Sequence, residues 1–281
     1  MRIWVLSLLS ILAFLAQPAA AATSPSLVNL ERQLEYIASA KGSDVGIAAL
    51  DLQTGETVAV KGHTPFPMAS TMKIAVAALY LSQVEHGRRS LDDTIGGVTA
   101  RSLMSRMMIR SDNRATDILL ADLGGPKVLH EWLVQNGLQG LRVDRNIARL
   151  LADKRDLWDV RDSSTPLAMV DLLKKIYRAE LIRPASRNYL LDLMARCQTG
   201  KNRIRGMLPF GTPVENKTGT LNGLSDDVGF ITMPDGRRIA IAVFARGGSD
   251  RPRTIAEAAR TIYDGFSRLL TWPLSGAFSG Q

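Results

Sequence analysis

One stretch decides how this chain folds and what it can do: Ser70-Thr71-Met72-Lys73-Ile74-Ala75-Val76-Ala77-Ala78-Leu79. The apolar run from Ile74 to Leu79 predicts a buried helix that opens at Ser70. Positions i and i+3 share one helix face, so the Lys73 amine can reach the Ser70 hydroxyl. An amine can activate a serine hydroxyl where burial or a nearby cation lowers its pKa. The helix start also offers free backbone N–H groups to a developing oxyanion.

Two further short motifs follow this stretch. Ser-Asp-Asn at 111–113 comes after an apolar run, and Lys-Thr-Gly-Thr at 217–220 ends a strand-like run. Each motif has an ordinary structural explanation when taken alone: a helix cap, a loop before a helix, or an edge strand with a glycine bulge. Together, and in this order, they favour one shared catalytic site.

Apolar spacing predicts the elements around these motifs. Helices are predicted at 27–40, 70–86, 101–110, 114–123, 126–135, 166–179, 185–198 and 254–270. Strands are predicted at 44–50, 57–60, 214–218, 228–233 and 238–245. Because the strands come from both ends of the chain, we expect an α+β fold with an antiparallel five-stranded sheet flanked by helices, plus an all-helical subdomain. The active site is expected in the cleft between them.

The N-terminus predicts export. Arg2 precedes a short apolar run, and small residues at 19–22 provide an Ala-x-Ala cleavage signal, so residues 1–22 are expected to be a signal peptide. The alternative is an uncleaved anchor, for which the apolar run is short. Residues 23–281 are then a single catalytic domain, with a sheet subdomain at about 23–68 and 212–281 and a helical subdomain at about 69–211. We expect a secreted, periplasmic protein with no stable membrane anchor after cleavage.

Composition argues against several other classes of function. The formal net charge is +8, but charged runs mix signs and no basic cluster is interleaved with aromatic residues, so no nucleic-acid partner is expected. His63, His86 and His130 lie far apart without metal-ligand spacing, so neither a metal nor another cofactor is expected. Cys197 is the single cysteine, which excludes an intramolecular disulfide, and we expect it to be a buried small hydrophobe.

From about residue 45 to 270 the chain resembles the class A serine β-lactamases. The resemblance rests on the three motifs, on Phe66–Ala69, and on the segments at 123–125, 161–166 and 234–236. It implies that Ser70 is the acylated nucleophile and that Lys73 is its base, directly or through water. Ser111 would relay a proton to the departing ring nitrogen. Asn113 would bind Lys73 and the substrate's side-chain amide.

The resemblance also assigns roles to the third motif. Lys217 would lower the proton affinity of Lys73 and attract the substrate carboxylate. Thr218 and Thr220 would offer hydroxyls to that carboxylate, with Gly219 between them. The backbone N–H groups of Ser70 and Thr220 would form the oxyanion hole.

Members of this family carry an arginine near the substrate carboxylate. One of its usual positions, after Lys-Thr-Gly, is occupied here by Asp226, an acid where a base is common. Arg203 fits the alternative position, and we assign it that role.

The chain departs from the family pattern in the loop that serves deacylation. Arg145 and Asp162 match the ion pair that closes this loop, but Ile147 stands where the family has a glutamate and Leu151 where it has an asparagine. An isoleucine cannot accept a proton and would exclude the hydrolytic water. Acylation of Ser70 is therefore expected to proceed and deacylation to be slow. A substitute base is the alternative, and its candidates are Asp153, Asp156 and Asp159.

These observations predict a class A β-lactamase-like serine hydrolase that opens β-lactam amides through an acyl-enzyme at Ser70. One alternative is a serine hydrolase or D,D-peptidase-like enzyme acting on another amide or ester. The other is a non-catalytic penicillin-binding or sensor protein that is acylated and held. In each case the partner is a β-lactam or peptidoglycan-like small molecule, and a monomer is expected.

Overall fold

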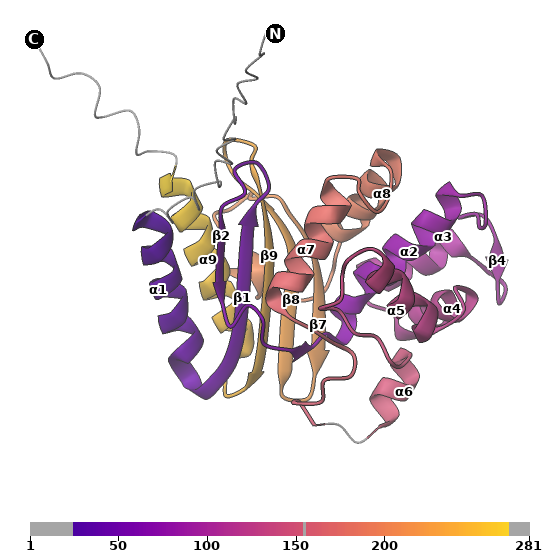
Figure 1. Cartoon of the computed structure of the whole chain (residues 1–281), viewed down its shortest axis with the longest axis horizontal. Coiled ribbons are helices and arrows are strands. Elements are labelled where there is room, and N and C mark those ends of the chain that lie inside the picture. The colour runs from indigo at the N-terminus through magenta and orange to yellow at the C-terminus, as the bar shows by residue number, and fades with distance from the viewer. Residues whose placement is uncertain (1–24, 154–155, 270–281) are drawn as a thin grey trace, which may run out of the picture.

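The computed structural model describes residues 25–153 and 156–269, and the predicted signal peptide lies outside the described residues. The centre is a five-stranded antiparallel sheet in the order β2-β1-β9-β8-β7 (Figure 1). Its strands are β1 (Ser43–Asp51), β2 (Thr57–Val60), β7 (Val214–Leu221), β8 (Leu224–Thr232) and β9 (Arg238–Gly247). Strands from both ends of the chain thus share one sheet, which confirms the predicted α+β fold.

Helices cover both faces of this sheet (Figure 1). On one face lie α1 (Pro25–Ser39) and α9 (Arg251–Leu269), and on the other lies α7 (Pro166–Tyr177), with α8 (Pro184–Ala195) against β7. The remaining helices gather beyond α7 and are α2 (Lys73–Glu85), α3 (Ala100–Ile109), α4 (Asn113–Asp122), α5 (Pro126–Gln135) and α6 (Ile147–Ala152). The short elements are η1 (Ala40–Gly42), β3 (Phe66–Pro67), η2 (Ala69–Met72), β4 (Thr94–Ile95), β5 (Val98–Thr99), β6 (Ser163–Ser164) and η3 (Ile204–Gly206).

The residues of β1 divide between two hydrophobic clusters. Ile47 and Ala49 pack with α1 and α9, whereas Ala48 and Leu50 belong to the cluster that contains α2 and α7. Successive side chains of a strand point to opposite faces of the sheet. A sheet with helices on both faces therefore needs an almost continuously apolar strand, as β1 is.

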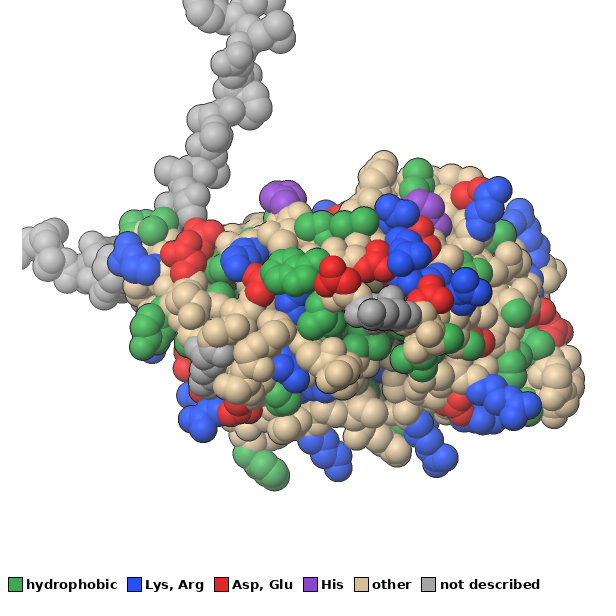
Figure 2. All heavy atoms as spheres, turned by 90° about the horizontal axis from the view of Figure 1, so that it is seen from below, with side chains coloured by type: hydrophobic (Ala, Val, Ile, Leu, Met, Phe, Trp, Pro, Cys, Tyr) green, Lys and Arg blue, Asp and Glu red, His purple; other side chains and the backbone are tan. Residues whose placement is uncertain are grey.

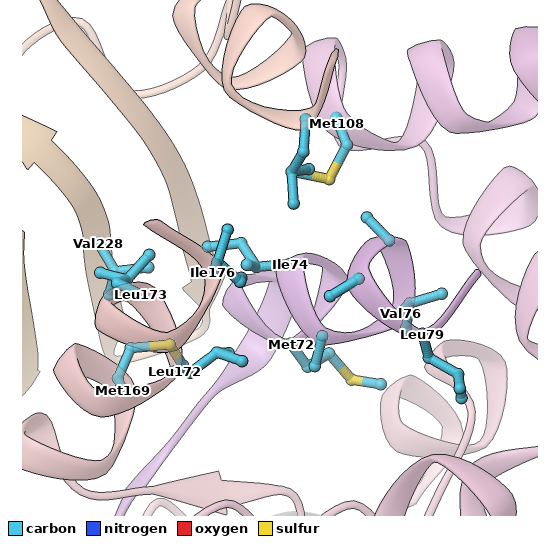
Figure 3. Packing of buried hydrophobic residues seen from close by; sticks show 14 of the residues in the cluster. Met72, Ile74, Val76, Leu79, Met108, Met169, Leu172, Leu173, Ile176 and Val228 are labelled. Atoms are coloured by element: carbon cyan, nitrogen blue, oxygen red, sulfur yellow. The ribbon is translucent and has the colours of Figure 1, made fainter. Parts of the chain in front are cut away.

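The helix that follows the predicted nucleophile is buried on all sides. Every residue of α2 from Lys73 to Ser82 is buried, as expected for a helix that is apolar around its whole circumference. Figure 3 shows Ile74 of α2 beside Ile176 of α7, with Met108 of α3 nearby. This packing holds α2, and with it Lys73, at the centre of the molecule.

The structure differs from the predicted elements in several places, and three of the differences lie near the motifs. The predicted helix at 70 begins as the 3₁₀ turn η2, and α2 starts at Lys73. Strand β7 continues to Leu221 without a bulge at Gly219, because it stays paired with β8 up to the hairpin. Helix α6 was not predicted. It is capped from α4, where Asp117 accepts hydrogen bonds from the N–H groups of Ile147 (2.7 Å) and Ala148 (2.9 Å).

Gly229 is where β8 needs a glycine. A Cβ atom there would lie 1.9 Å from the carbonyl oxygen of Glu215 in β7. We expect Gly229→Ala to lower the free energy of unfolding by at least about 2 kcal/mol, because the two strands must separate to admit the methyl group. Urea unfolding followed by circular dichroism measures the change. In the control variant Gly206→Ala the new Cβ would approach the Cβ of Ala256 to 3.3 Å, and its unfolding midpoint should move much less. Equal midpoints for the two variants would contradict the argument.

Candidate active site

The structure brings the three predicted motifs together around one hydroxyl group. Lys73 Nζ donates to the Ser111 carbonyl oxygen (2.7 Å), to Ser111 Oγ (3.1 Å) and to Asn113 Oδ1 (2.7 Å). Lys217 Nζ donates to the same Ser111 Oγ (2.9 Å) and to the Thr218 carbonyl oxygen (2.9 Å). A serine hydroxyl has two acceptor lone pairs and one proton. When both amines are protonated, they occupy both lone pairs of Ser111 Oγ, and its proton is left for a third partner.

Two residues at this cluster have backbone angles that L-residues rarely adopt. Ala69, directly before Ser70, has φ +46°, and Ser111 has φ +59°. In this conformation the carbonyl oxygen of Ser111 accepts a hydrogen bond from Lys73, and its hydroxyl accepts hydrogen bonds from both Lys73 and Lys217. Such strain persists where the surrounding structure over-determines the backbone, and it is common at functional sites.

Ser70 lies at the edge of this cluster. Its side chain is partly buried in η2, three residues before Lys73. Within the described residues no hydrogen bond joins Ser70 Oγ to Lys73 Nζ, because the donors of Lys73 are turned to Ser111 and Asn113. Ser70 and Lys73 thus sit one turn apart as predicted, but the predicted direct hydrogen bond between their side chains is not formed.

Burial sets the charge state of both lysines. The side chains of Lys73 and Lys217 are completely buried. Desolvation, followed by the positive charge of Lys217, lowers the pKa of Lys73 from 10.5 to about 7. Desolvation is also the largest influence on Lys217, whose pKa falls to about 8, with Arg203 lowering it further and Asp227 opposing the change. At neutral pH a substantial share of Lys73 is therefore uncharged and able to accept a proton.

The glycine of Lys-Thr-Gly lets β7 approach the turn that carries the serine. A Cβ atom on Gly219 would lie 2.8 Å from the Met68 carbonyl oxygen and 3.1 Å from the Ala69 Cβ. It would also meet the buried side chain of Asp226 at 2.7 Å. Only a residue without a side chain fits here, so Gly219 sets the spacing between β7 and Ser70.

Arg203 contacts the C-terminal end of β7. Its Nη1 donates to the carbonyl oxygens of Gly219 (2.7 Å) and Asp226 (2.8 Å), and its Nη2 donates to Thr220 Oγ1 (2.7 Å). Thr220 is exposed and next to this guanidinium group. The arrangement concentrates positive charge and a hydroxyl at one point of the strand.

Thr218 differs from Thr220 in its surroundings. Its side chain is buried, and its hydroxyl is 2.5 Å from the hydroxyl of Thr199, so it already has a partner. Cys197 Sγ lies 3.3 Å from the same Thr199 hydroxyl. The thiol is buried and free of a disulfide, which confirms the prediction of a small buried side chain.

The sequence analysis missed an acid beneath the strand motif. Asp227 is fully buried and accepts hydrogen bonds from Asn216 Nδ2 (2.8 Å) and from the Ile204 N–H (3.1 Å). Asn216 precedes Lys217 and Ile204 follows Arg203 in the chain. The Asp227 carboxylate therefore links the backbone segments that carry these two cations. Burial raises the pKa of Asp227 to about 6. The adjacent acids Asp226 and Asp227 in an otherwise apolar strand could have pointed to this carboxylate, but the sequence does not show which groups they contact.

The predicted ion pair of the deacylation loop is confirmed. Arg145 Nε is 2.6 Å from Asp162 Oδ2, and both side chains are buried. Ile147 is buried as well and belongs to the hydrophobic cluster around α2. The position where the family has a glutamate is thus part of the core.

The three candidate substitute bases are held within the loop itself. Asp153 pairs with Arg145 (3.0 Å), and Asp159 pairs with Arg161 (2.7 Å) and also with Arg145 (3.4 Å). The hydrogen bond from Arg161 lowers the pKa of Asp159 to about 2. Asp156 accepts the Trp158 N–H at 2.9 Å. Among the described residues their hydrogen-bond and ion-pair partners all lie in the loop, and none of the three forms a hydrogen bond with Ser70 or Lys73.

A single arginine ties this loop to the segment before the serine. The guanidinium group of Arg246 lies 3.5 Å from the centre of the Trp158 ring and 4.4 Å from that of Phe66. Its Nη1 donates to the carbonyl oxygens of Leu157 and Pro65, both at 3.1 Å. The loop and the strand leading to Ser70 therefore share one buried cation.

Two other kinds of site were sought in residues 25–153 and 156–269. No group of three or more His, Cys, Asp or Glu side chains there could hold a metal ion. Among the helices that the structure describes, none is long and apolar enough to cross a membrane.

The chain was compared with known families and relatives. The model of the Beta-lactamase enzyme family matches residues 29–266. The Extended-spectrum beta-lactamase PER-1 of Pseudomonas aeruginosa is 29% identical over 274 residues, covering 86% of this chain and 88% of the relative. The Carbapenem-hydrolyzing beta-lactamase KPC of Klebsiella oxytoca is 28% identical, covering 92% of this chain and 96% of the relative.

Solved structures agree with the sequence relatives. A variant of the last common ancestor of Gram-negative bacteria beta-lactamase class A superposes with a TM-score of 0.81 at 31% identity, covering 86% of this chain and 99% of the other. The TLA-3 extended-spectrum beta-lactamase gives a TM-score of 0.80 at 26% identity, covering 85% and 99% of the two chains. With the motif cluster assembled and both comparisons in agreement, the chain belongs to the class A serine β-lactamase family.

Proposed function

We propose that this protein opens β-lactam amides by acylation of Ser70 and releases the product slowly. The observation that carries the proposal is the convergence of two buried amines, Lys73 and Lys217, on the hydroxyl of Ser111. It is supported by relatives that are named for β-lactam hydrolysis.

Acylation requires a proton to leave Ser70 and another to reach the leaving nitrogen. Uncharged Lys73 takes the Ser70 proton, directly or through a water, and Oγ attacks the lactam carbonyl carbon. Backbone N–H groups of Ser70 and Thr220 receive the developing oxyanion. As the C–N bond breaks, Ser111 passes its proton to the ring nitrogen and regains one from protonated Lys73. Each proton removed from the nucleophile is thus delivered to the leaving group.

Substrate binding is assigned to the exposed end of β7 and to Asn113. Arg203, Thr220 and protonated Lys217 would hold the substrate carboxylate, through charge and hydrogen bonds. Asn113 is exposed and would bind the amide of the acyl side chain while it keeps Lys73 in place. Thr218 is assigned a supporting role, because its hydroxyl is already paired with Thr199.

Deacylation is the step for which residues 25–153 and 156–269 offer no evident base. Ile147 cannot accept a proton, and Asp153 and Asp159 are neutralised by arginines of the loop. General-base assistance contributes about 10²–10⁴-fold to such a step. We infer a long-lived acyl-enzyme, from which the product is released without that assistance.

The partner, location and oligomeric state of the protein are also part of the proposal. Figure 2 shows basic and acidic side chains interleaved on the face seen from below, unlike the clustered basic surface typical of nucleic-acid binding. Secretion to the periplasm, the monomeric state and the two subdomain boundaries stay predictions from the sequence.

The first experiment follows the intact mass of the protein after mixing with benzylpenicillin, together with nitrocefin hydrolysis. We expect a persistent adduct equal to one whole penicillin, and its absence in Ser70→Ala. The variant Ser102→Ala, which changes an exposed serine of α3, serves as the control and should be labelled normally. An adduct in Ser70→Ala would contradict the assignment of the nucleophile. Rapid turnover with a fleeting adduct would contradict slow release, and no adduct with any β-lactam would favour another acyl donor.

The second experiment restores the missing base. Ile147→Glu places a carboxylate at the start of α6, and we expect it to shorten the adduct lifetime by up to about 10²–10⁴-fold. Ile147→Gln has the same size without a base, so it should leave the lifetime close to that of the unchanged protein. Asp156→Ala should also leave it unchanged. A lifetime that lengthens in Asp156→Ala would identify the substitute base instead.

The third experiment measures the second-order rate of adduct formation against pH. The rate should fall as pH drops below about 7, because Lys73 becomes protonated, and it should fall again above about 8, where Lys217 loses its charge. Lys217→Gln removes the cation that helps to lower the Lys73 pKa, so its acidic limb should move to higher pH. An acidic limb that stays in place would show that Lys217 does not tune Lys73.

A further inference from the structure

A pocket of about 540 Å³ is lined by α4 and α6 and lies beside the proposed active site. The two helices are neighbours in the fold (Figure 1). We call this pocket the α4–α6 groove, and its lining residues are Asn113, Arg114, Asp117, Ile118, Ala121, Ile147, Ala148 and Leu151. The first five come from α4 and the last three from α6.

The surface of this groove is mostly apolar. Both carboxylate oxygens of Asp117 accept hydrogen bonds from backbone N–H groups at the start of α6, so this side chain is already paired within the protein. Arg114 can line the wall with its aliphatic stem while its guanidinium group stays in water. Leu151 is 56% exposed, although it is a large hydrophobic side chain. An apolar hollow open to water is a common sign of a binding site.

Two residues of the deacylation loop that differ from the family pattern, Ile147 and Leu151, contribute to the apolar surface of the groove. Ile147 and Leu151 stand where the resemblance leads one to expect a glutamate and an asparagine, and both line the groove. The change that removes the hydrolytic base therefore also replaces two polar wall positions with aliphatic ones.

The groove adjoins the catalytic cluster at Asn113. Asn113 lines one end of it, and the Oδ1 of the same side chain accepts Lys73 Nζ at 2.7 Å. Asn113, Asp117 and Ala121 are one turn apart on α4, so the groove runs for about 12 Å away from the cluster at 1.5 Å per residue.

We propose that the α4–α6 groove holds an extended apolar side chain of the acyl donor bound at Ser70, so that the protein favours donors with long alkyl or aryl acyl groups. The inference rests on the proposed acylation of Ser70. Each methylene of the donor that is buried against the apolar wall of the groove should raise the rate of acylation about fourfold, since its burial is worth about 0.8 kcal/mol.

The test compares three acyl donors by their second-order rates of adduct formation: 6-aminopenicillanic acid, which has no acyl side chain, benzylpenicillin, and an octanoyl penicillin. We expect the rates to rise in that order. Ala121→Trp fills the far end of the groove from an exposed position, and it should lower the ratio of the octanoyl rate to the 6-aminopenicillanic acid rate at least about tenfold. Ala185→Trp, at an exposed position of α8 outside the groove, should leave that ratio unchanged.

Labelling by 6-aminopenicillanic acid also reports that each variant is folded. Equal rates for the three donors, or an unchanged ratio in Ala121→Trp, would overturn the groove as an acyl side-chain site and leave the proposed function standing. Failure of all three donors to label Ser70 would overturn the proposed acylation, and this inference with it.

Discussion

The site depends on the removal of two ammonium groups from water at one place. Lys73 and Lys217 are both buried, and both direct Nζ to the hydroxyl of Ser111. Burying like charges so close together is unfavourable unless one of them gives up its proton, and Lys73 has the lower pKa of the two. The core around α2 and the close approach of β7 at Gly219 maintain this arrangement. Packing of the core around Lys73 therefore keeps the pKa of its amine at about 7.

Much of the site follows from the sequence because its signals are local. Ser-x-x-Lys, Ser-Asp-Asn and Lys-Thr-Gly are short motifs, and the apolar spacing around them was enough to place them on a helix start, a helix cap and a strand. The supports of the site are not local. Asp227 joins residues 204 and 216, and Asp117 caps a helix some thirty positions away in the chain, as the hydrogen bond to Ile147 shows. No pattern within one segment predicts which distant backbone groups a carboxylate will meet.

The deacylation loop keeps the ion pair expected of the family while one of its functional positions carries an aliphatic side chain. Arg145 and Asp162 keep the ion pair that closes the loop, and Asp153 and Asp159 reinforce it. Ile147 inside that frame has become part of the hydrophobic core. Membership of the family and speed of hydrolysis are thus separate properties: the first rests on fold and motifs, and the second, in the function proposed above, on the side chain at position 147.

Arg246 gives the loop a further property. Its guanidinium group stacks between Trp158 and Phe66 and donates to carbonyl groups on both segments. Opening either segment would break hydrogen bonds and ring contacts of this guanidinium group, so we expect the two segments to open together. The loop and the strand before Ser70 therefore form one cooperative unit, whose amide protons should exchange with solvent at similar rates although the two segments lie far apart in the chain.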